Sequence, residues 1–163
     1  MSWFNRLKQT HRSPTELLSS ILYDEDTFYN KFAQDLLSAK QEVIIESPFI
    51  STKRMIMLRS LFEKLIQKRV KVHIFTRSPY EHCGEYEIQS EEEIQYFEKL
   101  GVQIFLCLGN HHRKLAMVDR TILWEGSLNI LSQTHSREIM RRMDSKKMTE
   151  EMFKFLRFGR WIS

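Results

Sequence analysis

The stretch HHRKLAMVDRTILWEGSLN, residues 111–129, holds the most informative pattern of the chain. Written as spacing it is H-x-K-x4-D-x6-G-S-x-N, and its fixed positions are His112, Lys114, Asp119, Gly126, Ser127 and Asn129. If each fixed position is matched by chance about one time in twenty, a random match at a given start occurs with a frequency on the order of 10⁻⁸. The pattern is therefore a specific signal, whereas a single histidine would carry little information.

The residue types in this stretch suit phosphodiester chemistry. Residues 112–118 alternate as in a β-strand, which would place His112 and Lys114 on one face. Ser127 and Asn129 repeat the i, i+2 spacing at the end of the next predicted strand, TILWEGSLN. Preorganised donors directed at one small volume can meet the negative charge of a phosphoryl transition state. Near neutral pH a histidine can attack as a neutral base and protonate a leaving oxygen as a cation.

Each half of the pattern also has a simpler interpretation. A histidine and a lysine two residues apart on a strand usually face solvent and have no function. A G-S-x-N sequence is usually a turn, because Gly and Asn tolerate positive φ. The joint spacing of all the fixed positions decides against both interpretations.

The spacing resembles the HKD signature of the phospholipase D superfamily, whose members cleave or transfer phosphodiesters through a phosphohistidine. The resemblance implies that His112 is the nucleophile and that Lys114 and Asn129 bind the phosphate. Ser127 is implied as a hydroxyl partner in the same phosphate-binding site. It also implies a reaction without a metal or another cofactor, since lysine and asparagine would supply the charge neutralisation that Mg²⁺ gives other nucleases.

Two acidic residues complete the catalytic set that the resemblance implies, which is His112, Lys114, Asp119 and Glu138. In this family the aspartate is more a structural than a reacting residue. Glu138, in THSREIM, matches an acidic residue on the following strand of related nucleases. Its carboxylate would orient the histidine ring and stabilise the imidazolium, as in a catalytic triad.

A single copy of the motif predicts a homodimer. Cleavage through a histidine needs one group that attacks and another that protonates the leaving oxygen. His11, His73 and His82 lack a following H-x-K pattern, and His111 would point to the opposite strand face; at 163 residues the chain is too short for two halves. The small single-motif endonucleases that the sequence resembles are two-fold dimers. We therefore expect two copies of His112 in one shared site.

The order of predicted elements indicates an α/β fold, with a mixed, mostly parallel sheet flanked by helices on both faces, as the resemblance to phospholipase D also implies. Predicted helices cover residues 26–39, 52–68, 91–100 and 149–157, and predicted strands cover 42–47, 70–77, 102–108, 112–118, 121–129 and 138–141. We expect residues 1–14 to be a basic N-terminal arm that can be flexible. Residues 15–163 are expected to form a single phosphodiesterase domain with its functional loops at one set of strand ends.

The composition, 42% hydrophobic and 28% charged residues, is that of an ordinary globular protein. No apolar run approaches the ~18 residues needed to span a bilayer, and the start of the chain has no secretory signal. Cys83 and Cys107 have no disulfide spacing. We therefore expect a cytoplasmic protein without membrane insertion. The other possibility for the two cysteines is a metal site formed by His82, Cys83, Cys107 and His111, but these residues lack the paired spacing of metal ligands.

The charge balance favours a polyanionic substrate. The net charge is +4 and the isoelectric point is near 9.1, which is a mild bias. Together with the small size and the single motif, it favours a nuclease that acts on DNA or RNA. One alternative is a phospholipid phosphodiesterase or transferase, for which only WFNRL near the N-terminus suggests an anchor. Another is the nuclease module of a larger helicase, restriction or defence protein.

Three further segments can shape the substrate site. The loop 76–92 carries Arg77, Tyr80, His82 and Tyr86 and is equally well a wall of the site or a solvated connection. SPFIS, residues 47–51, resembles the end of the first strand in HKD proteins, near the active-site floor. The C-terminal region concentrates basic residues that can meet phosphates: Arg137, Arg141, Arg142, Lys146, Lys147, Arg157 and Arg160.

Overall fold

The computed structural model describes residues 19–81 and 85–162, and the predicted N-terminal arm lies outside these ranges. The elements follow one another in the order β1 (Ile21–Asp24), α2 (Phe28–Ser38), β2 (Glu42–Glu46), α3 (Thr52–Gln67), β3 (Lys71–Arg77), η1 (Pro79–Glu81), α4 (Glu85–Leu100), β4 (Gln103–Cys107), β5 (Leu115–Val118), β6 (Ile122–Gly126), β7 (Ile139–Asp144), α5 (Lys146–Phe155) and η2 (Phe158–Arg160). The order of helices and strands that the sequence predicts is confirmed, apart from the unpredicted strand β1 and the short helical turns η1 and η2.

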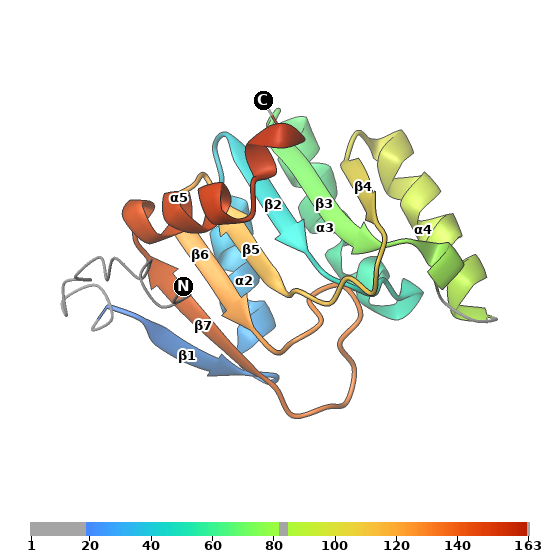
Figure 1. The fold of residues 1–163 in the computed structure, drawn as a ribbon, viewed down its shortest axis with the longest axis horizontal. Helices are drawn as coiled ribbons and strands as arrows, with labels where there is room; N and C mark the ends of the chain where they lie inside the picture. Colours follow the sequence, from blue (N-terminus) through green and yellow to red (C-terminus); the bar gives the residue numbers. More distant parts are fainter. Residues whose placement is uncertain (1–18, 82–84, 163) are drawn as a thin grey trace, which may run out of the picture.

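Within the described ranges, the strands form one mixed sheet in the order β1-β7-β6-β5-β2-β3-β4 (Figure 1). The β2–β3 and β3–β4 pairs are parallel, and every other neighbouring pair is antiparallel. The prediction of a mostly parallel sheet is therefore wrong. Helical crossovers through α3 and α4 allow parallel pairing of β2, β3 and β4, whereas a tight turn joins β5 to β6 and permits only a hairpin.

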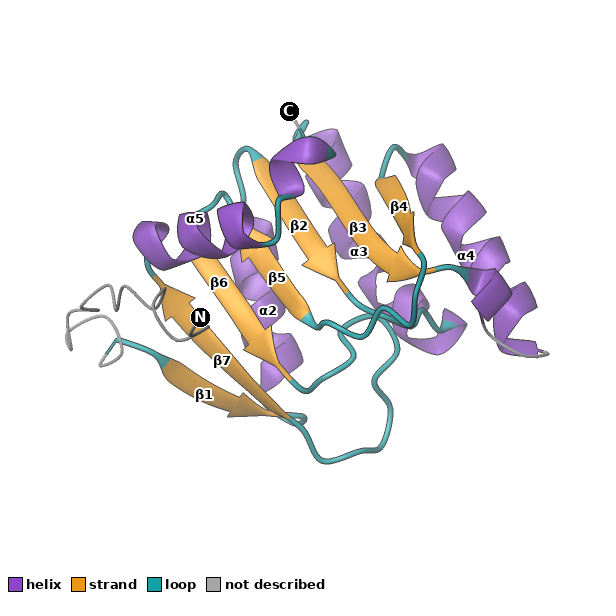
Figure 2. Cartoon of the chain, in the orientation of Figure 1, coloured by secondary structure: helices purple, strands orange, loops and turns teal. Residues whose placement is uncertain are grey.

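Helices cover both faces of the sheet, as the sequence predicts (Figure 2). The apolar sides of α2, α3 and α4 pack on one face. The ring centroid of Trp124 lies 5.1 Å from that of Phe28 and 6.1 Å from that of Phe32 on α2, and Phe62 of α3 meets Phe97 of α4 at 5.3 Å. Helix α5 and the turn η2 pack on the other face through Phe153 and Phe158. Because β2 lies between these two layers, all of its residues are buried, which explains its apolar centre, Val43–Ile45.

Strand β5 begins at Leu115, so the prediction of a strand from His112 onward is wrong. Residues 111–114 form an irregular segment that leads into β5. The guanidinium of Arg113 in this segment reaches the end of β2, where its Nη2 atom lies 2.7 Å from Oε1 of buried Glu46, while half of the Arg113 side chain stays exposed. The neighbouring side chains of this segment are then free to point toward the other side.

Asp119 lies at the opposite end of β5 from His112. Its carboxylate accepts hydrogen bonds from the backbone N–H groups of Lys40, Gln41 and Glu42, at 2.9, 2.8 and 3.0 Å. Asp119 itself has φ +50°, within the tight turn between β5 and β6. These bonds fasten that hairpin to the connection between α2 and β2, which is a structural role.

Replacing Asp119 by alanine is expected to lower the free energy of unfolding by roughly 1–3 kcal/mol, because three backbone donors lose their acceptor. Urea denaturation followed by circular dichroism measures the change. Asp144→Ala is the matched control, since Asp144 is 67% exposed and lies 3.6 Å from Arg142. That control should change stability by less than about 1 kcal/mol. Equal losses in the two variants would contradict the structural role of Asp119.

Candidate active site

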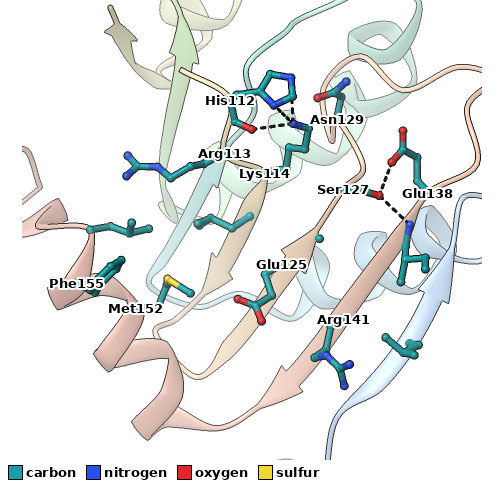
Figure 3. Close-up of a pocket in the computed structure, with 15 residues that line it drawn as sticks. His112, Arg113, Lys114, Glu125, Ser127, Asn129, Glu138, Arg141, Met152 and Phe155 are labelled. Atoms are coloured by element: carbon teal, nitrogen blue, oxygen red, sulfur yellow. Dashed lines mark hydrogen bonds between the residues drawn. The ribbon is translucent and has the colours of Figure 1, made fainter. Parts of the chain in front are cut away.

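Antiparallel pairing brings three segments of the chain to one edge of the sheet. The end of β6 lies beside the starts of β5 and β7, with Glu125 opposite Leu115 and Gly126 opposite Met140. The residues just outside these strand ends line an open pocket of about 880 Å³ (Figure 3). Its lining residues are Leu22, His112, Arg113, Lys114, Leu115, Glu125, Gly126, Ser127, Asn129, Glu138, Ile139, Arg141, Met152, Phe155 and Leu156.

His112 and Lys114 lie together at one end of the pocket. The Lys114 ammonium is 2.8 Å from Nδ1 and 3.4 Å from Nε2 of the imidazole, and it donates to the His112 backbone carbonyl at 2.7 Å. Partial burial lowers the pKa of Lys114, and the Glu138 carboxylate opposes this shift. The ring of Phe49 stands edge-on to the imidazole at 6.2 Å between centroids. The imidazole of His112, as a nucleophile, and the positive charge of Lys114 thus lie within hydrogen-bond distance of each other.

Ser127 and Glu138 form a second polar pair in the pocket. The Ser127 hydroxyl donates to Oε2 of Glu138 and accepts from the Ile139 backbone N–H at 3.1 Å. Oε1 of Glu138 accepts from the Ser136 hydroxyl at 2.7 Å. No hydrogen bond joins Glu138 to His112 within the described residues, so the role of Glu138 in orienting the imidazole stays a prediction.

Asn129 contributes an amide whose oxygen is buried and has no hydrogen-bond partner in the part of the chain that the structure describes. Its backbone is fixed, because its carbonyl accepts from the N–H groups of Ser132 and Gln133 at 3.0 and 2.8 Å. Buried polar atoms are nearly always paired in proteins. Because this oxygen accepts hydrogen bonds, it calls for a donor, and the group of Asn129 that can donate to a phosphate oxygen is its Nδ2.

Glycine is required at position 126 because two strands approach closely there. A Cβ atom at this residue would lie 2.1 Å from the Ile139 carbonyl oxygen and 2.9 Å from Cα of Met140. Neither of these backbone atoms can move without separating β6 from β7. The fixed glycine of the motif thus keeps Ser127 within reach of Glu138.

A family profile described as "Cardiolipin synthase, PLD-like domain" matches residues 32–157. The chain belongs to the phospholipase D superfamily. Members of this superfamily are phosphodiesterases, and the membership that the motif predicts is confirmed. No curated protein matches the sequence.

Solved structures with the same fold include two chains of similar length. Nuc, a phospholipase D family member from Salmonella typhimurium, matches with a TM-score of 0.68 and 16% identity over 84% of this chain and 90% of that one. NucT from Helicobacter pylori has a TM-score of 0.64 and 20% identity, with coverages of 83% and 91%. Phosphatidylserine synthase from Haemophilus influenzae has a TM-score of 0.66 and 14% identity over 87% of this chain and 38% of that one. These likenesses show the fold.

In this member of the phospholipase D superfamily the fold brings together five of the predicted site residues: His112, Lys114, Ser127, Asn129 and Glu138. Asp119, which the sequence places in the catalytic set, does not line the pocket. The physical reason is that β5 separates it from His112, and its carboxylate is held by the backbone of the connection between α2 and β2.

A buried carboxylate beneath the motif was missed by sequence reasoning. Glu46, at the end of β2, is fully buried, and its Oε1 atom accepts from Nε and Nη2 of Arg113 at 2.9 and 2.7 Å. Nε2 of His111 lies 3.2 Å from the same oxygen. Burial raises the pKa of Glu46, while burial and the charge of Arg113 lower the pKa of His111 to about 4. The only sequence signal was a charged residue closing the apolar run EVIIE.

The three other segments that the sequence singles out contribute unequally. Residues 47–51 lie near the site, because Phe49 faces His112. In the loop 76–92, Arg77 binds Glu81 and the side chain of Asn110, so it supports the segment before the motif and does not line the pocket. The side chains of His82 and Tyr86 lie outside the described part of the structure.

In the basic C-terminal region, Arg141 lines the pocket, whereas Arg142 turns to the other sheet face and binds Asp35 at 2.7 Å. Of the alternative metal cluster, Cys107 and His111 lie in described regions, and His82 and Cys83 do not. The residues that the structure describes contain no group of three or more histidine, cysteine, aspartate or glutamate residues that could hold a metal ion.

Arg113→Ala is expected to lower the free energy of unfolding by roughly 1–3 kcal/mol, because the variant leaves Glu46 buried without its partner. A carboxylate whose pKa is raised in the folded state contributes stability below its unfolded pKa and loses it as the pH rises. The deficit of the variant relative to the wild type should therefore grow as the pH rises from about 4.5, the ordinary pKa of a glutamate, because the pKa of Glu46 is raised in the folded state. Urea denaturation across this range measures it.

The double variant Glu46→Gln/Arg113→Ala is the control, since it has no buried charge to lose its partner. Its stability relative to Glu46→Gln keeps only the pH dependence of His111, whose pKa the Arg113 charge lowers, so it should change less with pH than the stability of Arg113→Ala does relative to the wild type. A deficit of Arg113→Ala that is constant with pH would contradict the buried ion pair.

Proposed function

We propose that the protein is a metal-independent endonuclease that cleaves DNA or RNA through a phosphohistidine at His112, in a site shared by two copies of the chain. The placement of Lys114 against His112, in a pocket that Asn129 also lines, carries this proposal. A phosphodiester needs a nucleophile beside fixed donors, and this end of the pocket supplies both.

In the proposed reaction, a ring nitrogen of His112 attacks phosphorus and the bond from phosphorus to the leaving oxygen breaks. The Lys114 ammonium and the Nδ2 group of Asn129 donate to the non-bridging oxygens and stabilise the charge that develops on them. The leaving oxygen takes a proton from a second acid. Water then attacks the phosphohistidine, the phosphorus–nitrogen bond breaks, and His112 is regenerated as the neutral base.

A second copy of the chain is the proposed source of the acid. His112 is the only histidine among the described residues that line the pocket, and it cannot both form the phosphorus–nitrogen bond and protonate the leaving oxygen. In a two-fold dimer, His112 of a second copy fills this role, and the two imidazoles titrate as a coupled pair. The match to nine-tenths of the chains of Nuc and NucT supports a single-motif organisation of this kind.

Nucleic acid is the proposed substrate because of charge and size. The net charge of +4 and Arg141, which lines the pocket, favour a polyanion. None of the helices in the ranges 19–81 and 85–162 has the length and apolarity to span a bilayer. The cytoplasmic location stays a prediction.

A phospholipid substrate is the second candidate, favoured by the apolar side chains on the far wall of the pocket and by the fold of phosphatidylserine synthase.

Cleavage of end-labelled single- and double-stranded DNA and RNA in excess EDTA tests the proposal. The wild type should cut at least one of these polymers, and His112→Ala should cut it at least ~10³-fold more slowly, because the nucleophile is gone. His135→Ala is the matched control, since His135 is exposed and does not line the pocket. It should cut at the wild-type rate.

Loss of cleavage in EDTA, or full activity of His112→Ala, would contradict the proposed mechanism. A sizing column run on the active protein tests the shared site separately. A strict monomer that still cuts would exclude His112 of a second copy as the acid. Cleavage of phospholipid, with no cleavage of any nucleic acid, would move the function to the second candidate.

A further inference from the structure

The connection between β6 and β7, residues 127–138, carries Ser127, Asn129 and Glu138 but contains neither a helix nor a strand. Glu138 is only partly buried, and its side chain rotates about several single bonds. Such a side chain gives up its rotamer freedom only where specific contacts hold it. The contacts of the Glu138 carboxylate therefore decide where its negative charge lies.

Ser136, which does not line the pocket, provides one of these contacts. Its hydroxyl donates to Oε1 of Glu138 at 2.7 Å, while the Ser127 hydroxyl donates to Oε2 (Figure 3). Oε1 of Gln133 is a second acceptor near the Ser136 hydroxyl, at 3.0 Å. A hydroxyl has one hydrogen, and the nearer, charged acceptor binds it more strongly. Each oxygen of the Glu138 carboxylate thus has a serine donor.

Gln133 holds Ser136 in turn and ties it to Asn129. Gln133 is 5% exposed, and its Nε2 group donates to the carbonyl of Ser136 at 2.7 Å. Its backbone N–H donates to the carbonyl of Asn129 at 2.8 Å. The carbonyl of Gln133 accepts from Nε and Nη2 of Arg54 at 3.0 and 2.6 Å, and that guanidinium lies 3.7 Å from the ring centroid of Tyr29. Helix α3 therefore fixes the place of Ser136 through Gln133.

The position of the Glu138 charge matters for Lys114, which lines the same pocket. Partial burial lowers the pKa of Lys114, and the charge of Glu138 counteracts this shift. Because the interaction between charges falls with distance, a carboxylate that turned away would stabilise the Lys114 ammonium and a nearby imidazolium less. The same carboxylate repels a phosphodiester, so it does not favour substrate binding. Its orientation should therefore affect the chemical step and not the affinity for substrate.

We propose that Ser136 is a positioning residue for the reaction, whose hydroxyl, held in place by Gln133, keeps the Glu138 carboxylate against Ser127 and inside the pocket. The inference rests on the phosphohistidine reaction proposed above. It adds to that reaction a side chain that acts on the site from outside the pocket.

Hydrolysis of bis(p-nitrophenyl) phosphate in excess EDTA tests this role, since this synthetic diester does not depend on which natural substrate the protein takes. Ser136→Ala should lower kcat by roughly 10-fold or more, with KM within about twofold of the wild type. Ser136→Thr keeps the hydroxyl, and because Ser136 is exposed the added methyl group has room; its kcat should stay within about threefold of the wild type. Thr134→Ala is the matched control, since Thr134 is exposed, belongs to the same connection and does not line the pocket. It should keep the wild-type kcat and KM.

A crystal structure of Ser136→Ala gives a second readout, which needs no activity. In it the Glu138 carboxylate should have left Ser127 or should take more than one orientation.

Any of three results would overturn the role of Ser136. They are an unchanged kcat in Ser136→Ala, an equal loss of kcat in the alanine and threonine variants, and a Glu138 carboxylate that keeps its wild-type orientation in the crystal of Ser136→Ala. If the wild type hydrolyses the synthetic diester but no nucleic acid, the nuclease function is wrong and the role of Ser136 stands. If the wild type hydrolyses no phosphodiester, the proposed reaction is wrong, and with it the role of Ser136 in that reaction.

Discussion

The antiparallel pairing of β5, β6 and β7 is the constraint on which the pocket depends. Because neighbouring strands run in opposite directions, the start of β5, the end of β6 and the start of β7 lie at the same edge of the sheet. The polar residues just outside these ends must then meet. Gly126 lets β6 approach the backbone of β7 closely, and this brings Ser127 to Glu138. The chemistry comes from loop residues that a rigid sheet holds in place.

Electrostatics fixes the direction of the side chains in the motif segment. Glu46 is buried at the end of β2 and draws the Arg113 guanidinium inward. His112 and Lys114, on either side of Arg113, then face the pocket. The carboxylates of Glu46, below the segment, and of Glu138 also balance the positive charges of the site, which a phosphate needs for binding. An ion pair therefore holds residues 111–114 in place, whereas the hydrogen bonds between neighbouring strands would hold a β-strand.

Much of the site could be predicted from the sequence, because the spacing of the motif records which side chains meet. The alternation of His112 and Lys114 was interpreted correctly as a shared direction, although its cause is the Arg113–Glu46 pair and not a strand. The prediction of a mostly parallel sheet was wrong, because helices alternate with strands only as far as β4, and β5, β6 and β7 follow without helices between them. Glu46 was missed, since the role of a charge beside an apolar run becomes clear only when the distant segment that carries Arg113 lies against it.

The covalent bond between phosphorus and His112 is the central claim. The most direct test mixes the protein with a labelled oligonucleotide in excess EDTA, stops the reaction with denaturant at alkaline pH, and locates the adduct by mass spectrometry of the peptides. The account predicts a nucleotide adduct on the peptide that contains His112, absent from His112→Ala. An adduct on another residue, or cleavage without any adduct at times when product accumulates, would contradict it.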